Sequence, residues 1–209
     1  MEIFSKEDLH NLYDQLAERD NLLKMILVEY SYPPLWIRPN SFETLVLTIL
    51  EQQVSLASAY AAYKKLKERT EITANNLLQL TDEDLRNCYL SRQKTIYTKA
   101  LANAIINKEI DLDKFENLSD EEVRNSLIKL KGIGNWTIDI YLIHALQRTD
   151  VFPVGDLALI NAIKMATKQP QLTKEEILIM SQKWKPYRSI ATMLFWHYYI
   201  KKKNIKLLH

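Results

Sequence analysis

Apolar residues recur along most of this chain at the three- and four-residue spacing of an amphipathic helix. The clearest run comprises Phe42, Leu45, Val46, Ile49 and Leu50, which share one face of a helix with about 3.6 residues per turn. Residues that favour helix starts stand before such runs. These starts are Ser5, Ser41, Thr81 with Asp84, Ser91, Ser119 with Glu122, Asp156, and Thr173 with Glu176. The pattern predicts an all-α fold, with at most one short strand near the N-terminus.

Composition indicates a globular protein and argues against disulfide-linked, metal-binding and membrane-spanning classes. Apolar residues make up 47% and charged residues 26% of the chain, as in ordinary globular proteins. The net charge of +2 is too small to indicate nucleic acid by itself. The single cysteine, Cys88, excludes an intrachain disulfide, and the histidines and this cysteine have no metal-ligand spacing. No apolar run approaches the ~20 residues of a membrane span, and the charged N-terminus has no signal region. We expect an intracellular protein.

Two of the three glycines, Gly132 and Gly134, are separated by one residue and lie between two helical runs. Free backbone N–H groups beside glycines, at a helix N-terminus, bind anions without a positive side chain. DNA phosphates are a source of such anions. Ile133 can fill the joint between the helices, and Lys131 is a candidate phosphate contact. The alternative is an ordinary turn between two helices with no ligand.

Asp156 follows an extended stretch after Pro153 and precedes a helical run with Leu157, Ile160 and Ile163. Its simplest role is the N-cap of that helix. A helix N-terminus also favours a negatively charged carboxylate. The position would therefore suit a catalytic group that must stay negative, and both roles remain open from the residues alone.

The segment that contains these features resembles the helix-hairpin-helix DNA glycosylases. The matching pattern is L-x-G-I-G-x-W-T, followed by D-V-F-P-x-x-D-L-x-L. The residues that carry it are Leu130, Gly132, Ile133, Gly134, Trp136, Thr137, Asp150, Val151, Phe152, Pro153, Asp156, Leu157 and Leu159. Segments 42–59, 91–102 and 184–199 agree in the same order, so the resemblance runs from Arg38 to Tyr199. It is strongest to the alkylated-base branch, the 3-methyladenine DNA glycosylase II type, in a compact form without an N-terminal β domain.

The resemblance implies two helical subdomains. One would be a central subdomain over residues 40–152 that carries the hairpin at 130–136. The other would combine residues 1–39, whose end is marked by prolines, with residues 153–209. The active-site cleft would lie between them, with Asp156 at the seam.

The resemblance also implies an activity, which is hydrolytic release of alkylated purines such as 3-methyladenine and 7-methylguanine in base excision repair. Asp156 would be the catalytic residue. Relatives that also cut the strand use a lysine nucleophile where this chain has Trp136, so we expect a monofunctional enzyme. Where relatives carry a further pocket tyrosine, this chain has Ile140, and the range of lesions can differ.

An enzyme that acts on a base must flip it out of the stack, which requires an aromatic pocket and a wedge, the side chain that fills the vacated space. The resemblance places the wedge at Gln53, beside Gln52, although these amides would also suit a helix surface. Aromatic residues at helical spacing are often core. Candidates for the pocket are Trp136, Tyr141, Trp196 and Trp36, with Trp184 and Tyr187 considered beside them.

The expected partner is double-stranded DNA with damaged bases, bound by a monomer, in the cytoplasm and nucleoid or in a nucleus. Arg188 is a further candidate DNA contact. No cofactor is expected, although the resemblance implies a structural monovalent cation on the backbone of residues 130–135. Three alternatives remain open, namely a glycosylase for oxidised or deaminated bases, a non-catalytic DNA-binding module and a structural helical scaffold.

Overall fold

The computed structural model describes residues 2–206 and divides them into two compact units. Unit 1 contains the described residues up to Ile37 together with Leu142–Lys206, and unit 2 contains Arg38–Tyr141. Residues 1 and 207–209, the ends of the expected 1–39 and 153–209 segments, lie outside the described residues.

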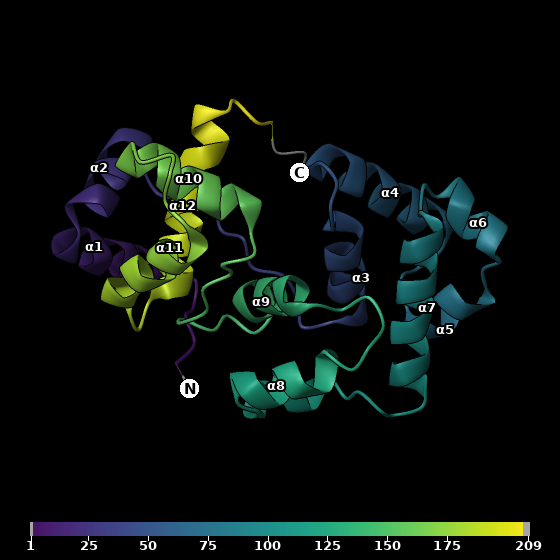
Figure 1. Ribbon diagram of the computed structural model, residues 1–209. Helices are drawn as coiled ribbons and strands as arrows, with labels where there is room; N and C mark the ends of the chain where they lie inside the picture. Colours follow the sequence, from purple (N-terminus) through teal and green to yellow (C-terminus); the bar gives the residue numbers. More distant parts are fainter. Residues whose placement is uncertain (1, 207–209) are drawn as a thin grey trace. The chain divides into compact units, whose positions relative to one another are not determined.

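The expectation of an all-α protein is confirmed over residues 2–206, where only helices and one isolated antiparallel bridge, Ile3 with Arg148, are formed (Figure 1). This bridge stands where a short strand was expected. The α-helices are α1 (Leu9–Arg19), α2 (Asn21–Tyr30), α3 (Phe42–Glu51), α4 (Leu56–Arg69), α5 (Ala74–Gln79), α6 (Asp82–Asn87), α7 (Arg92–Ile106), α8 (Asp120–Leu127), α9 (Asn135–His144), α10 (Leu157–Thr167), α11 (Lys174–Ser181) and α12 (Arg188–Lys202), with 3-10 turns η1 (Asp113–Asn117) and η2 (Gln182–Trp184).

Side chains at the predicted starts cap six of the twelve α-helices within residues 2–206. Each cap side chain accepts a hydrogen bond from a backbone N–H that has no partner within its helix, which stabilises the first turn. Capping side chains stand at Ser41, Thr81, Ser91, Ser119, Asp156 and Thr173, and the pairs with Asp84, Glu122 and Glu176 form capping boxes. The start expected at Ser5 is wrong, because α1 begins at Leu9 after Asp8, whose backbone N–H donates to Ser5 Oγ.

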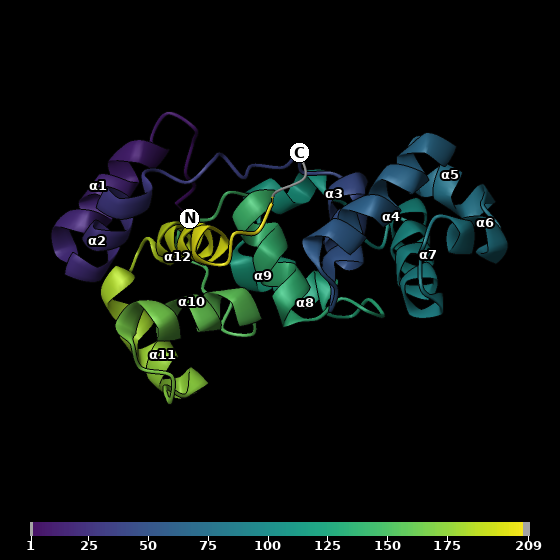
Figure 2. The same ribbon diagram turned by 90° about the horizontal axis from the view of Figure 1, so that it is seen from above.

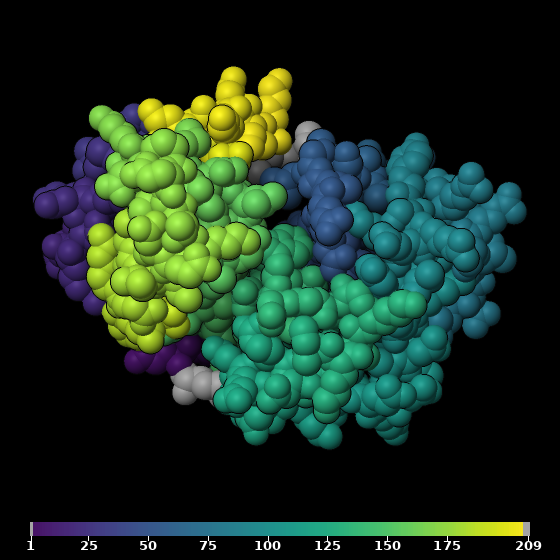
Figure 3. Space-filling view, in the orientation of Figure 1, coloured from purple at the N-terminus to yellow at the C-terminus, as the bar shows by residue number. Residues whose placement is uncertain are grey.

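Unit 1 is built around α12. This helix packs against α1, α2 and α10, and Figure 2 shows it between the α1–α2 pair and the α10–α11 pair. Every residue from Ser189 to Tyr198 is buried, so apolar surface is removed from water on all sides of the helix. In the space-filling view the light green α10 and α11 form one continuous surface with the yellow α12 (Figure 3).

Unit 2 is organised around α7, which packs against α3, α5 and α6, while α4 packs on α3. The fully buried Leu45, Ile49, Leu66 and Leu101 supply part of its core. The helix α9 starts in this unit and continues past Tyr141 into unit 1. Among the described residues, no helix is long and apolar enough to cross a membrane.

Candidate functional site

The predicted hairpin is present between α8 and α9, and its two glycines have different surroundings. Gly132 has φ +89, and a Cβ added there would lie 2.0 Å from the Tyr97 ring. Only glycine combines this backbone conformation with so close an approach. Gly134 has ordinary φ and open space where its Cβ would be. Between them Ile133 is buried at 3% exposure and fills the joint between the helices, as expected.

The helices that flank the hairpin are joined by Arg124 of α8. Its guanidinium donates to Asn135 Oδ1 at 2.9 Å and to Asp139 Oδ1 at 2.5 Å, at the first and second turns of α9. Burial raises the pKa of the Asp139 carboxyl, and the positive charge of Arg124 opposes this shift. The expected phosphate contact Lys131 is exposed beside the hairpin. Arg124 therefore fixes the angle at which α9 leaves the glycine turn.

Asp156 is the N-cap of α10 and lies in unit 1 at 8% exposure. Its Oδ1 accepts one hydrogen bond of 2.7 Å from the Leu159 backbone N–H and another of 3.0 Å from Trp196 Nε1. A carboxylate oxygen that accepts from two N–H donors is held in one orientation. The residues alone favoured an N-cap, and the indole donor from α12 is the feature that an ordinary cap does not need.

Trp196 belongs to an aromatic cluster in unit 1. The His144 ring stacks on its indole, with centroids 5.4 Å apart and planes at 19°, and Trp36 meets it edge-on at 6.4 Å. His144 Nδ1 lies 2.6 Å from the carbonyl of Trp36, so this nitrogen carries the proton and donates. The structure thus brings together two of the predicted pocket residues, Trp36 and Trp196, with Asp156. Sequence reasoning missed His144, which has no motif around it.

Two more of the predicted pocket residues, Trp136 and Tyr141, lie in unit 2. Trp136 is half-buried in the first turn of α9. Tyr141 is fully buried; its hydroxyl donates to Asn40 and its ring meets Phe115 edge-on. Its ring therefore belongs to the core of the unit. Trp184 is likewise fully buried in unit 1, where its Nε1 donates to Asp20.

The two adjacent glutamines proposed for the wedge stand in the loop after α3, and their side chains have different surroundings. The Gln52 side chain turns toward the hairpin, where its Nε2 donates to Gly132 O at 2.8 Å and to Thr137 Oγ1 at 2.9 Å. Gln53 is exposed and has φ 56, a left-handed conformation that few residues other than glycine adopt. Of the two, Gln53 is the one whose side chain the loop presents to solvent.

Arg188, expected as a DNA contact, is held by an ion pair within unit 1. Its Nε and Nη2 donate to the two carboxylate oxygens of Asp150 at 2.7 and 2.9 Å. One residue along, the Val151 N–H donates to Ser189 Oγ at 2.9 Å. These contacts fasten the strand-like segment that leads to Asp156 onto α12. In this structure Arg188 therefore stabilises the segment that leads to Asp156.

Among residues 2–206, no group of three or more His, Cys, Asp or Glu side chains is arranged to hold a metal ion. The backbone of residues 130–135 is the place where the resemblance implies a monovalent cation. There the carbonyls of Leu130 and Gly134 accept one N–H each, and that of Gly132 accepts the Gln52 amide. Each carbonyl oxygen has two lone pairs, and carbonyl oxygens are suitable ligands for a hard cation.

Comparison with known proteins gives one consistent result. Residues 46–186 match the model of the HhH-GPD superfamily of base excision DNA repair proteins. The chain is 30% identical to a DNA-3-methyladenine glycosylase of Bacillus subtilis, over 90% of this chain and 67% of that protein. It is also 30% identical to DNA-3-methyladenine glycosylase 1 of Schizosaccharomyces pombe, over 74% and 71%. A solved 3-methyladenine DNA glycosylase of Schizosaccharomyces pombe, in complex with abasic DNA, superimposes with a TM-score of 0.83 at 26% identity, covering 95% of this chain and 100% of the other.

Proposed function

Since the chain belongs to the HhH-GPD superfamily of base excision DNA repair proteins, we propose that it is a monofunctional DNA glycosylase. It releases alkylated purines of the 3-methyladenine and 7-methylguanine type from duplex DNA. The support lies in relatives named DNA-3-methyladenine glycosylase in Bacillus subtilis and Schizosaccharomyces pombe. It lies also in the similar fold of the Schizosaccharomyces pombe enzyme that was solved in complex with abasic DNA. Binding to DNA, the partner common to this superfamily, follows from the same observations.

The observation that carries the proposal is the fixed carboxylate of Asp156. Its Oδ1 accepts from Leu159 N and from Trp196 Nε1, so two helices of unit 1 orient it. Breaking an N-glycosidic bond develops positive charge on the sugar. A carboxylate that is already oriented stabilises that charge without reorganisation and can direct a water to the same carbon.

The chemistry of alkylated purines removes the need for a second catalytic carboxyl. An alkylated purine carries positive charge and leaves as a neutral base, so no general acid has to protonate it. An indole face binds such a cation more tightly than a neutral base, by about 0.5–2 kcal/mol. Trp196 of unit 1 is the residue to which we assign this selection, and Trp36 supports its indole from the edge. A pocket role for Trp136 stays a prediction.

The reaction ends at an abasic site. Strand cleavage by relatives requires an amine nucleophile that forms a Schiff base with the sugar, and the matching position in this chain is Trp136. We therefore assign no lyase activity. The enzyme works as a monomer on damaged duplex DNA, in the cytoplasm and nucleoid of a bacterium or in a nucleus.

DNA contacts are assigned to unit 2. The backbone N–H groups around Gly134 bind a phosphate of the damaged strand, where the open space beside this glycine allows close approach. Lys131 adds a positive charge from the exposed side of the hairpin. Gln53 is the wedge. A monovalent cation on the backbone of residues 130–135 would supply charge for the same phosphate, and no step of the reaction depends on it.

The test is base release. Purified protein is incubated with duplex DNA that contains 3-methyladenine and 7-methylguanine, and the freed bases are separated by chromatography. The control is Asp156→Asn, whose amide oxygen can still accept from Leu159 and Trp196. We expect release by the wild type, a loss of at least about 100-fold in the variant, and uncleaved abasic sites.

Binding of the methylated duplex without release of either base would overturn the assignment to alkylated purines. Equal release by wild type and Asp156→Asn would keep the activity and remove Asp156 from its centre. Strand cleavage at the abasic site, trapped as a covalent complex by borohydride, would overturn the monofunctional assignment.

A further inference from the structure

The side chain of Gln52 connects two loops that are far apart in the sequence. Gln52 follows the last residue of α3, and both N–H groups of its amide have acceptors in the hairpin segment, the carbonyl of Gly132 and the hydroxyl of Thr137. An amide nitrogen has only two hydrogens to donate. Both hydrogens of the Gln52 amide are therefore donated to the hairpin segment, to residues 80 and 85 positions further along the chain.

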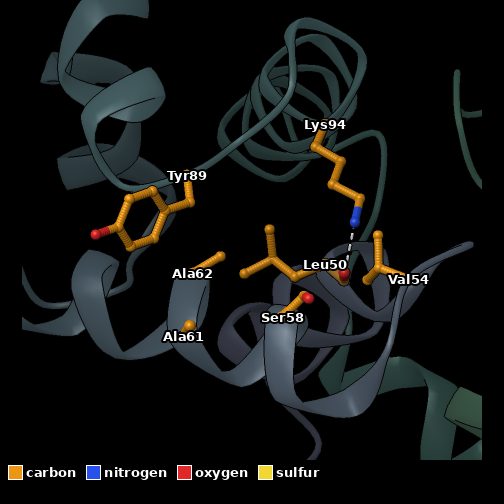
Figure 4. A pocket seen from close by; sticks show the side chains of 7 residues that line it. All are labelled: Leu50, Val54, Ser58, Ala61, Ala62, Tyr89 and Lys94. Carbon is orange, nitrogen blue, oxygen red and sulfur yellow. Dashed lines mark hydrogen bonds between the residues drawn. The ribbon is translucent and has the colours of Figure 1, made fainter.

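The helix α7 supports the same two loops from one side. Lys94 Nζ donates to the carbonyl of Leu50 at 2.6 Å, as Figure 4 shows, in the last turn of α3. Burial lowers the pKa of the Lys94 ammonium, so the bond to this carbonyl is made in a partly dehydrated place. Three residues on, which is one turn of the helix, the Tyr97 ring lies against Gly132. One face of α7 thus contacts both the end of α3 and the hairpin.

The loop that Gln52 begins presents its following residues to solvent. Gln53 has a left-handed backbone, and Val54 and Leu56 are 45% and 47% exposed. A residue held in a sparsely populated backbone conformation persists only when the structure around it fixes the loop. Two side chains fix the start of this loop. Gln52 bonds it to the hairpin, and Lys94 bonds the last turn of α3 to α7. We call residues 52–55 the α3–α4 loop.

We propose that Gln52 is a positioning residue that couples the α3–α4 loop to the hairpin. Insertion of the loop into the base stack and binding of the phosphate by the hairpin then occur together. The inference rests on the proposed function, because it takes both loops to be DNA contacts. It replaces the expectation that Gln52 shares the wedge role, since a wedge amide must be able to leave its protein partners, and leaves that role to Gln53.

The physical reason for such a link is preorganisation. Two loops that move independently each lose conformational freedom when DNA binds, whereas two loops already fixed to each other lose it before binding. A contact made by one loop then places the other for its own contact. Perturbing either loop should consequently weaken the contribution of the other, as is expected for residues of one hydrogen-bond network.

The experiment is a pair of double-mutant cycles. Gln53→Ala perturbs the loop and Gly134→Ala perturbs the hairpin, and the dissociation constant is measured for a duplex with a tetrahydrofuran abasic analogue at fixed salt. With Gln52 present, the effects of the two changes should be non-additive by at least about fivefold. In the Gln52→Met background, which keeps the length of the side chain and removes its amide, the two effects should become additive.

Two further measurements separate coupling from loss of fold. Thr137→Val removes one acceptor of the Gln52 amide without changing any residue of the α3–α4 loop, and should lower the coupling only in part. Stopped-flow fluorescence of 2-aminopurine opposite the analogue should show one phase for the wild type. With Gln52→Met it should show a binding phase followed by a slower insertion phase. A merely structural role of Gln52 would lower the melting temperature and leave the coupling factor and the number of phases unchanged.

An unchanged coupling factor in the Gln52→Met background would overturn the inference, as would additive effects in the wild type. Coupling that is present in a protein that releases no alkylated base would support the inference while the proposed activity fails. Base release without coupling would have the opposite meaning, so the two failures are distinguishable.

Discussion

The indole nitrogen of Trp196 donates to the same oxygen of Asp156 that accepts the backbone N–H of Leu159. The cap of α10 is thereby oriented from α12 as well as from its own helix. Unit 1 contains a related pair, because Asp20 caps α2 through Oδ1, and its Oδ2 accepts from Trp184 Nε1 at 2.7 Å and pairs with Lys183. In both pairs an indole donates to a helix-capping aspartate, but only Asp156 belongs to the D-V-F-P-x-x-D pattern, so Trp184 serves as a control for Trp196.

Replacing Trp196 with Phe should slow base release by about tenfold or more. The change removes a hydrogen bond to a charged group, worth roughly 1.5–3 kcal/mol, and leaves a ring that can still stack on His144. The rate is measured under single-turnover conditions at a temperature at which the protein is folded. Trp184→Phe is the matched control and should lower the melting temperature with little change in the rate. Equal rate losses in the two variants would contradict an orienting role for Trp196.

Alanine at Gly132 should lower stability, whereas alanine at Gly134 should weaken DNA binding. Gly132→Ala should lower the free energy of unfolding by about 2 kcal/mol or more, because its φ is positive and its Cβ would meet the Tyr97 ring. Gly134→Ala should stay within about 0.5 kcal/mol of the wild type in stability. It should nevertheless weaken binding to abasic DNA about tenfold, because a methyl group occupies the phosphate approach. Urea unfolding and fluorescence anisotropy measure the two effects.

Removing Arg124 should destabilise the hairpin. In Arg124→Ala the buried Asp139 carboxylate loses its partner, which costs about 3 kcal/mol, the lower end for a broken buried pair because the Arg124 side chain is 32% exposed. The double change Arg124→Met with Asp139→Leu should recover most of this loss. Arg69→Met, which breaks the more exposed pair with Asp84, should cost less than about 1 kcal/mol. Similar losses for Arg124→Ala and Arg69→Met in urea unfolding would refute this account.

The free energy of unfolding should fall as the pH is lowered from about 7 to 5, in part because of His197. Burial lowers the pKa of His197 below its ordinary value of 6.5, and Lys201 adds to this shift, although the contact with the Tyr30 carbonyl opposes it. As the pH falls, the unfolded chain therefore binds a proton at this residue before the folded chain does, which favours unfolding. His197→Gln keeps a donor for Tyr30 and should flatten the pH dependence. A variant with the wild-type slope would exclude His197 as a contributor.

Local signals in the sequence were sufficient for much of the fold. A helix start depends on a side chain and the backbone three residues on, and such starts at Thr81, Ser119 and Thr173 were predicted with their capping partners and are confirmed. The caps at Asp20, Ser55 and Thr73 were missed. The N-cap role of Asp156 was likewise visible, since the helix that follows is local.

Contacts between distant segments were not predictable from these signals. Nothing near Gln52 indicates that its amide is bonded at the hairpin, and nothing near Arg188 indicates that it pairs with Asp150. The stacking of His144 on Trp196 depends on two helices from different parts of the chain. Such pairings are set by tertiary packing, which periodicity and composition do not encode.

The division of the chain has a consequence for its synthesis. Unit 2 is continuous in sequence from Arg38 to Tyr141, whereas unit 1 is made from segments before and after it. On the ribosome, where domains fold as units as they emerge, unit 2 can be complete while unit 1 still lacks its central helix. The hydroxyl of Tyr13 meets Met193 only after 180 further residues have been added. We therefore expect α1 and α2 to leave the exit tunnel with apolar faces exposed, and to be the segment of the nascent chain that chaperones bind first.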